Sequence, residues 1–170
     1  MMKKQKVIIF AGHDKSGKST IAKALSKELN IPIFKVQRDK RWWDPEVNLK
    51  YLTEGCTQMI EQTSMSVILD RWVDSDYMYS KLFDRDINYR KIWEIDERLS
   101  KLDTLLIVCY KEPSGYIVDE EDADYVNPKM YAAMTSYVNE FANQSKCRSI
   151  HINTTDQDLE KQINKIIENL

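Results

Sequence analysis

The chain has 170 residues, a length that fits one domain with a sizeable buried core. Its hydrophobic content of 42% and charged content of 31% are typical of globular proteins and exclude a disordered chain. The formal net charge of -2 excludes the strong positive field on which duplex DNA binding depends, so we expect no nucleic-acid partner.

Strand-like and helix-like segments alternate along the sequence. In chain order the pattern predicts a strand at 6–12, a helix at 19–30, a strand at 33–36, a helix at 45–63, a strand at 66–70, helices at 73–83 and 86–101, a strand at 103–110, a helix at 128–144 capped by Asn127, a strand at 147–153, and a helix from Thr155 onward. This order predicts one α/β domain over 1–170, in which helices cover both faces of a parallel sheet. We expect its ligand site at the carboxyl ends of the strands.

Membrane and metal signals are missing from the sequence. The apolar run "VIIFAG" at 7–12 is too short for a membrane span or a signal peptide, and no other run is longer. We therefore expect a cytoplasmic protein with no membrane partner. Cys56, Cys109 and Cys147 are far apart and lack metal-binding spacing, so we expect reduced, mostly buried thiols.

The segment 12–19, "GHDKSGKS", fits the motif G-x-x-x-x-G-K-[ST] between a buried strand and an amphipathic helix. Its glycines let backbone N–H groups form a nest for anions, and the following helix presents its positive end. In this motif Lys18 reaches the β- and γ-phosphates, and the Ser19 hydroxyl ligates Mg²⁺. The alternative is a tight glycine turn with an exposed lysine. The predicted ATP-binding residues are Gly12, His13, Asp14, Lys15, Ser16, Gly17, Lys18, Ser19 and Thr20.

Asp70 and Arg71 end the predicted strand 66–70 within "VILDRWVDSDYMYS". A carboxylate at such a strand end can hold the Mg²⁺ shell or orient the attacking phosphoryl oxygen. The arginine offers a planar fork that matches a phosphate in bidentate fashion. The alternative is a surface ion pair at a strand end, but the nearby phosphate loop favours a functional pair.

Together the two motifs resemble those of the thymidylate kinase family of nucleoside monophosphate kinases. "FAGHDKSGKST" is similar to that family's phosphate loop, and "ILDRWVDSDYMYS" is similar to its Asp-Arg-aromatic segment. The resemblance implies a P-loop kinase fold with five parallel strands in the order 2-3-1-4-5. It also implies a homodimer.

The resemblance implies roles for individual residues. Asp14 would bind the 3′-hydroxyl of the acceptor sugar, and Asp70 would act near Mg²⁺ and the transferred phosphoryl group. Arg71 would hold the acceptor phosphate. Ser75 and Tyr79 would lie beside the acceptor, with Tyr79 favouring deoxyribose. Arg38 corresponds loosely to a second arginine that grips the acceptor phosphate.

The transition-state cation lies in the phosphate loop or in a mobile lid in this family. The lid candidate, 111–127, contains no arginine and Lys111 as its one lysine, so Lys15 of the loop is the predicted cation. Arg85 and Arg90 are other possible donors, and a solvated surface charge is the alternative for Lys15. The catalytic residues predicted are Lys15, Lys18, Asp70 and Arg71.

The sequence predicts an ATP- and Mg²⁺-dependent kinase of a deoxynucleoside monophosphate, with a pyrimidine base favoured. Its adenine would lie near 153–156. The acceptor base is not determined, although Gln58, Gln62, Tyr51 or the pair Trp42 and Trp43 offer hydrogen bonds or stacking. The alternatives are a kinase of a deoxynucleoside or other small molecule, and a nucleotide-binding switch protein without kinase activity.

Overall fold

The computed structural model describes residues 5–35, 48–115 and 128–170. Its sheet contains β1 (Lys6–Ala11), β2 (Ile33–Lys35), β3 (Val67–Asp70), β4 (Asp103–Tyr110) and β5 (Arg148–Asn153). All neighbouring strands are parallel, and their order is β2-β3-β1-β4-β5. The predicted strand order is therefore confirmed. Because β3, β1 and β4 are parallel neighbours, their carboxyl ends meet at one edge of the sheet, where ligands bind in such folds.

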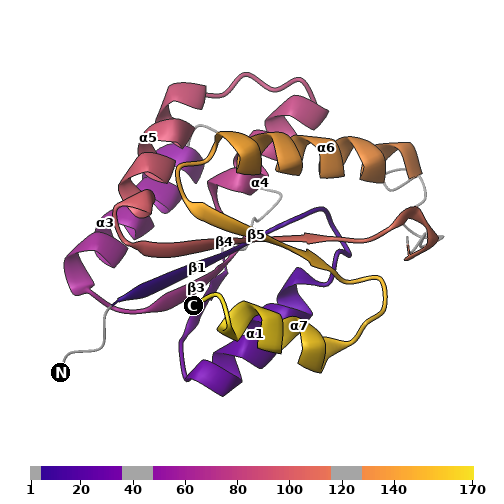
Figure 1. Cartoon of the computed structure of the whole chain (residues 1–170). Helices are drawn as coiled ribbons and strands as arrows, with labels where there is room; N and C mark the ends of the chain where they lie inside the picture. Colours follow the sequence, from indigo (N-terminus) through magenta and orange to yellow (C-terminus); the bar gives the residue numbers. More distant parts are fainter. Residues whose placement is uncertain (1–4, 36–47, 116–127) are drawn as a thin grey trace.

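Helices cover both faces of the sheet (Figure 1). One face carries α1 (Lys18–Leu29) and α7 (Leu159–Ile167), and the other carries α3 (Glu54–Thr63), α4 (Val73–Leu82), α5 (Tyr89–Ser100) and α6 (Pro128–Gln144). Two short helical turns complete the described elements, the π-helical η2 (Asn48–Thr53) and the 3₁₀-helical η3 (Pro113–Gly115). No helix in the described ranges is both long and apolar enough to cross a bilayer.

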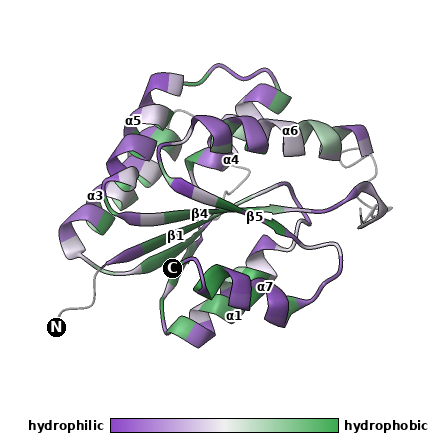
Figure 2. Cartoon of the chain, viewed as in Figure 1, coloured by the Kyte–Doolittle hydropathy of each residue, from purple (hydrophilic) through white to green (hydrophobic). Residues whose placement is uncertain are grey.

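The central strands are apolar on both faces, as Figure 2 shows for β1 and β4. Along β1, Val7 and Ile9 pack into the core under α3 to α6, whereas Ile8 and Phe10 pack into the core under α1 and α7. All four side chains are at most 4% exposed. Successive residues of a strand point to opposite faces, so an uninterrupted apolar run is required wherever both faces are covered.

Several predicted boundaries differ from the structure. The last helix was predicted from Thr155 but begins at Leu159, after two turns in which Asn153 and Asp156 side chains accept hydrogen bonds from backbone N–H groups two residues later. Asp158 then caps the helix by accepting from the N–H of Lys161. The helix predicted at 45–63 contains the π-helical η2 before α3, and its residues 45–47 lie outside the described part, as does Asn127.

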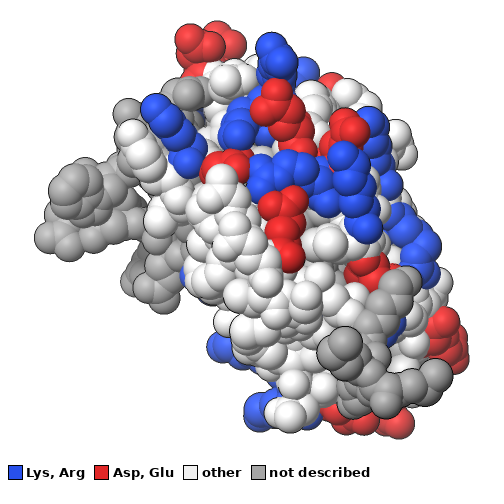
Figure 3. All heavy atoms as spheres, turned by 90° about the vertical axis from the view of Figure 1, so that its left-hand side faces the viewer, with Lys and Arg blue, Asp and Glu red and all other residues white. Residues whose placement is uncertain are grey.

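The helices α3 and α5 are joined by a cluster of charged side chains at a distance from the strand carboxyl ends. Arg98 binds Glu54 through Nη1 at 2.5 Å and Glu61 through Nε at 2.9 Å, and Lys91 lies 2.6 Å from Glu54. Figure 3 shows positive and negative side chains interspersed on this side of the molecule. The cluster stabilises helix packing and is independent of the phosphate loop.

Candidate active site

The phosphate loop, 12–20, joins the end of β1 to the first turn of α1. Gly12 has a φ of 144°, and a Cβ at this position would lie 2.3 Å from the carbonyl oxygen of Cys109. Gly17 has a φ of 85° and lies against Thr154. The Thr154 hydroxyl donates to the carbonyl oxygen of Ser16 at 2.7 Å. The loop is thus fixed to the ends of β4 and β5, and its two glycines are required by close approach and left-handed backbone.

Lys18 is the buried cation of this loop, with 4% of its surface exposed. Its ammonium donates to the carbonyl oxygen of His13 at 2.6 Å and lies 3.3 Å from the Ser16 hydroxyl. Burial, together with the nearby Arg71 guanidinium, lowers the pKa of Lys18 to about 8. An anion bound in the loop would therefore stabilise the charged form of this lysine.

His13 is a packing residue of the loop and is only 1% exposed. Its Nδ1 donates to the carbonyl oxygen of Asp14 at 2.6 Å, because a carbonyl can only accept. Burial lowers the pKa of His13 to about 4, and the charges of Lys18 and Lys111 act in the same direction. The ring is neutral at pH 7 and packs at an angle against Tyr131, with 4.8 Å between centroids.

Ser19 and Asp70 meet where the sequence predicts a magnesium site. The Ser19 hydroxyl donates to Asp70 Oδ2 at 2.6 Å, and Lys35 Nζ lies 3.3 Å from each of these two oxygens. Asp70 is 2% exposed, and its Oδ1 is buried without a hydrogen-bond partner in the described part of the chain. A hydroxyl and a carboxylate with a spare oxygen suit Mg²⁺, which completes its shell with water and phosphate.

Asp14, Arg71 and Tyr79 form a second cluster beside the loop. Arg71 donates to Asp14 Oδ1, and the Tyr79 hydroxyl donates to Asp14 Oδ2 at 2.6 Å. Burial opposes ionisation of Asp14, but Arg71 and Tyr79 outweigh it and hold the pKa of this carboxyl below its ordinary value. Arg71 has a φ of 73°, a left-handed conformation that is uncommon for a non-glycine residue. The structure thus brings together residues 14, 71 and 79, which are far apart in the sequence.

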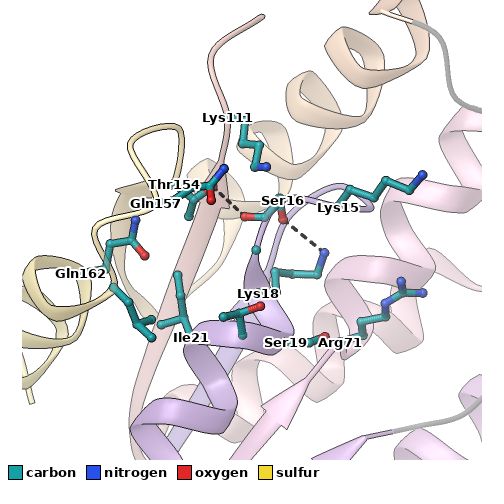
Figure 4. A pocket seen from close by; sticks show the side chains of 13 residues that line it. Lys15, Ser16, Lys18, Ser19, Ile21, Arg71, Lys111, Thr154, Gln157 and Gln162 are labelled. Carbon is teal, nitrogen blue, oxygen red and sulfur yellow. Dashed lines mark hydrogen bonds between the residues drawn. The ribbon is translucent and has the colours of Figure 1, made fainter. Parts of the chain in front are cut away.

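A cavity of about 460 Å³ opens beside the loop (Figure 4). Its walls are formed by the phosphate loop, by the residue that follows β3, by the residue that follows β4, and by the segment from the end of β5 into α7. The lining residues beyond 15–21 are Arg71, Lys111, Thr154, Gln157, Leu159 and Gln162. Figure 4 shows Lys111 reaching toward Ser16, whereas Lys15 extends away from Lys18.

Some residues predicted to lie beside the acceptor are not part of this cavity, and their roles stay predictions. Ser75 is 1% exposed in the first turn of α4, where its hydroxyl donates to Asp74, and it does not line the cavity. Gln58 and Tyr51 are exposed, and the Gln58 amide donates to Glu54 on the same helix. Arg38, Trp42 and Trp43 lie outside the described residues, as does 116–127 of the predicted lid.

Sequence reasoning gave no role in the site to Lys35 or Gln162, included Thr154 only within the stretch 153–156 near the adenine, and discounted Lys111. All four lie at or just after the carboxyl end of a strand, or on the helix that follows one. Their position relative to β2, β4 and β5 is the signal that could have identified them. Lysine, threonine and glutamine are too frequent at the surface for residue type to single them out.

No protein-family model and no curated protein matches the sequence. Solved structures do match. The YorR protein from Bacillus subtilis, solved in complex with phosphorylated GDP, is 22% identical, with 95% of this chain and 94% of that chain covered at a TM-score of 0.74.

Two kinases match over a similar extent. Deoxyadenosine kinase from M. mycoides with bound dATP is 18% identical, with coverage of 96% and 98% and a TM-score of 0.63. Thymidylate kinase from Ehrlichia chaffeensis is 14% identical, with coverage of 98% of both chains and a TM-score of 0.65. At these identities the likeness establishes the fold. The protein therefore has the P-loop fold shared by thymidylate kinases and deoxynucleoside kinases.

Proposed function

We propose that the protein is a Mg²⁺- and ATP-dependent deoxynucleoside monophosphate kinase that acts on a deoxypyrimidine 5′-monophosphate, such as dTMP, dUMP or a modified analogue. The observation that carries this proposal is the double connection between the phosphate loop and the end of β3. Ser19 binds Asp70, and Asp14 binds Arg71. Phosphoryl transfer needs donor and acceptor side by side, and these contacts place Asp14 and the serine of the loop that would bind Mg²⁺ against the two residues at the end of β3.

The acceptor would lie on the β3 side of the loop. There Arg71 offers its guanidinium to the acceptor phosphate, and Asp14 offers a carboxylate to the 3′-hydroxyl of the sugar. Tyr79, which contacts Asp14, would crowd the 2′ position and favour deoxyribose. Arg38 would supply a second contact to the acceptor phosphate.

The donor would lie in the 460 Å³ cavity, with its phosphates in the loop and its base near Gln162. The Gln162 amide nitrogen donates to the Asn153 carbonyl at 3.3 Å and to Asp156 Oδ1 at 3.2 Å. Both of these bonds use Nε2, and because Gln162 lines the cavity its Oε1 would be the atom to accept from an amino group of the base. Adenine carries a donor amino group at the position where guanine carries an acceptor oxygen, so adenine is favoured.

Magnesium, when bound, neutralises charge on the β- and γ-phosphates, and Ser19 and Asp70 are the residues that would hold it. The residues of the chain would bind and orient the two nucleotides and exclude water. An oxygen of the acceptor phosphate attacks the γ-phosphorus while the bond from that phosphorus to the β–γ bridging oxygen breaks, giving ADP and a deoxynucleoside diphosphate. Because the attacking oxygen is already anionic, no strong general base is required.

A second candidate is a deoxynucleoside kinase. The observation that favours it is the buried Asp70 Oδ1, which has no hydrogen-bond partner within the described ranges and could take the proton of an acceptor hydroxyl. The position of Asp14 against Arg71 favours the monophosphate instead.

The decisive test measures the release of ADP from ATP, or of GDP from GTP, with Mg²⁺ and separately with each deoxynucleoside and each deoxynucleoside monophosphate. We expect turnover with ATP and a deoxypyrimidine monophosphate. Release of ADP with nucleosides alone would select the second candidate, and no acceptor-dependent release would refute both kinase proposals.

We also propose a homodimer. The exposed apolar side chains of η2 and α3, which include Leu52 at 44% and Met59 at 49%, would lie in its interface. Light scattering coupled to gel filtration measures the mass directly, and a mass near that of one 20.1 kDa chain would contradict the proposal.

A further inference from the structure

We propose that Lys111 binds the β-phosphate of the donor nucleotide and remains with the ADP product, as a second cation supplied by the end of β4. The inference rests on the proposed use of a nucleoside triphosphate in the cavity. It concerns the donor only, so it can be tested without an acceptor.

The burial of Lys111 is the first observation. Lys111 is 8% exposed, yet it has no hydrogen bond or ion pair to any residue that the structure describes. Lysine is almost never buried at this level without a partner, because removing an ammonium from water is costly. Its side chain lines the same cavity as the phosphate loop. A bound anion would supply the counter-charge that the described residues do not give this lysine.

The backbone on both sides of Lys111 is fixed. The Tyr110 carbonyl accepts from the Thr154 N–H at 2.9 Å, and the Glu112 N–H donates to the Thr155 hydroxyl at 2.8 Å. The lysine is thus held between two contacts to the end of β5. This position gives the site a cation placed before the nucleotide arrives, and preorganised charge of this kind is the most effective in phosphoryl transfer.

The strand order decides which phosphate Lys111 meets. In the order β3-β1-β4-β5, Arg71 and the proposed acceptor lie on one side of the loop, whereas Lys111 lies on the other. The γ-phosphoryl group must point toward β3 to reach the acceptor. Lys111, on the β4 side and near Ser16 in Figure 4, therefore meets the part of the donor that leaves as ADP.

The test is Lys111→Met, with Lys23→Met as the matched control on the exposed face of α1. We expect ADP binding, measured by calorimetry with Mg²⁺, to weaken about ten- to hundredfold, as for loss of one charge-assisted hydrogen bond. We expect the KM of the acceptor to stay unchanged. The apo variant should also melt at a higher temperature than the wild type, because an uncompensated buried charge has been removed.

An unchanged ADP affinity in Lys111→Met would overturn the inference. So would weaker ADP binding combined with a lower melting temperature, because that pair of results marks a residue that supports the fold. The test distinguishes failure of the kinase proposal from failure of the Lys111 proposal. If the wild type transfers no phosphoryl group but Lys111→Met still loses ADP affinity, the kinase proposal fails and this inference stands.

Discussion

The two sides of the phosphate loop are built differently. On the acceptor side, facing β3, the charged groups already bind one another: Asp14 holds Arg71, and Asp70 holds Ser19 and Lys35. On the donor side, facing β4 and β5, a cavity of about 460 Å³ is open, and Lys111 has no partner among the described residues.

The two sides differ in whether their charged side chains are paired before a nucleotide binds. In the proposed function an acceptor phosphate would take Arg71 away from Asp14, so its binding would exchange one ion pair for another. The donor would meet Lys111, which has no partner among the described residues, so its binding would supply a counter-charge. We therefore expect the empty protein to bind the donor more readily than the acceptor, and variants on either side of the loop test this expectation.

The largest effect is expected for Arg71→Ala on the acceptor side. Removing the guanidinium should lower kcat/KM for the acceptor by about 10³-fold, because a bidentate charged contact to the reacting phosphate is lost. Steady-state kinetics of ADP release measures this effect. Arg71→Lys is the control, and it should recover only a small part, since lysine keeps the charge without the fork. A loss in kcat/KM smaller than tenfold would show that Arg71 does not bind the acceptor phosphate.

Lys15→Met tests the loop cation that the sequence predicts. It should lower kcat by about 10²-fold and leave ADP affinity within a few-fold, because a transition-state contact acts on the rate. This is the opposite pattern to that of Lys111→Met. Methionine keeps the length of the side chain and meets the same φ of 60°, so backbone strain is matched. An unchanged kcat would show that Lys15 is a surface charge.

Lys18 gives the donor side a pH dependence. Its pKa is about 8 in the empty loop, so Lys18 is mostly neutral above pH 8. Because a bound phosphate favours the charged ammonium, binding above pH 8 should be accompanied by uptake of a proton. ADP affinity should therefore fall roughly fivefold from pH 8 to pH 9, with proton uptake at these pH values. Calorimetry in two buffers of different ionisation enthalpy measures the uptake. Binding without proton exchange at pH 9 would contradict the lowered pKa.

The smallest effect on activity is expected far from the loop, at the α3–α5 cluster. Arg98→Met should lower the unfolding free energy by about 1 kcal/mol, and the melting temperature by about 3 °C, with kinetics unchanged. The hydrogen bonds from Lys91 and Arg98 outweigh burial and lower the pKa of Glu54 to about 2. This stabilisation is present above pH 4.5 and is lost as the pH falls toward 2. Chemical denaturation at pH 7 and pH 3 measures both effects, and a change in kcat would link the cluster to the site.

Much of the fold followed from local patterns. The apolar runs at 6–12 and 103–110 are buried on both faces, and that burial is what makes an uninterrupted run a reliable signal. The turns after Asn153 and Asp156 were missed because their side chains compete with the helix for backbone N–H groups, and this competition depends on local geometry. The start of the last helix was therefore predicted too early.

The candidate site was predictable where residues are adjacent in sequence. The phosphate loop is one continuous segment, and its spacing alone fixes its glycines, Lys18 and Ser19. The contact of Asp14 with Arg71 and Tyr79 joins residues 57 and 65 positions apart, so local sequence carries no record of it. The resemblance placed the three residues around the acceptor without pairing them, and the parallel order of β1 and β3 explains why they meet.

By itself the sequence determined a five-strand α/β domain with an anion-binding loop, because glycine spacing and apolar periodicity are local properties of the chain. Only the tertiary structure decided which charges face the nucleotide. Lys111 was predicted to belong to a lid with little positive charge, yet β4 delivers it to the cavity wall, where contacts with Thr154 and Thr155 hold the backbone on either side. Whether a lysine is solvated or buried beside a phosphate loop depends on the strands packed next to it, and those come from distant parts of the chain.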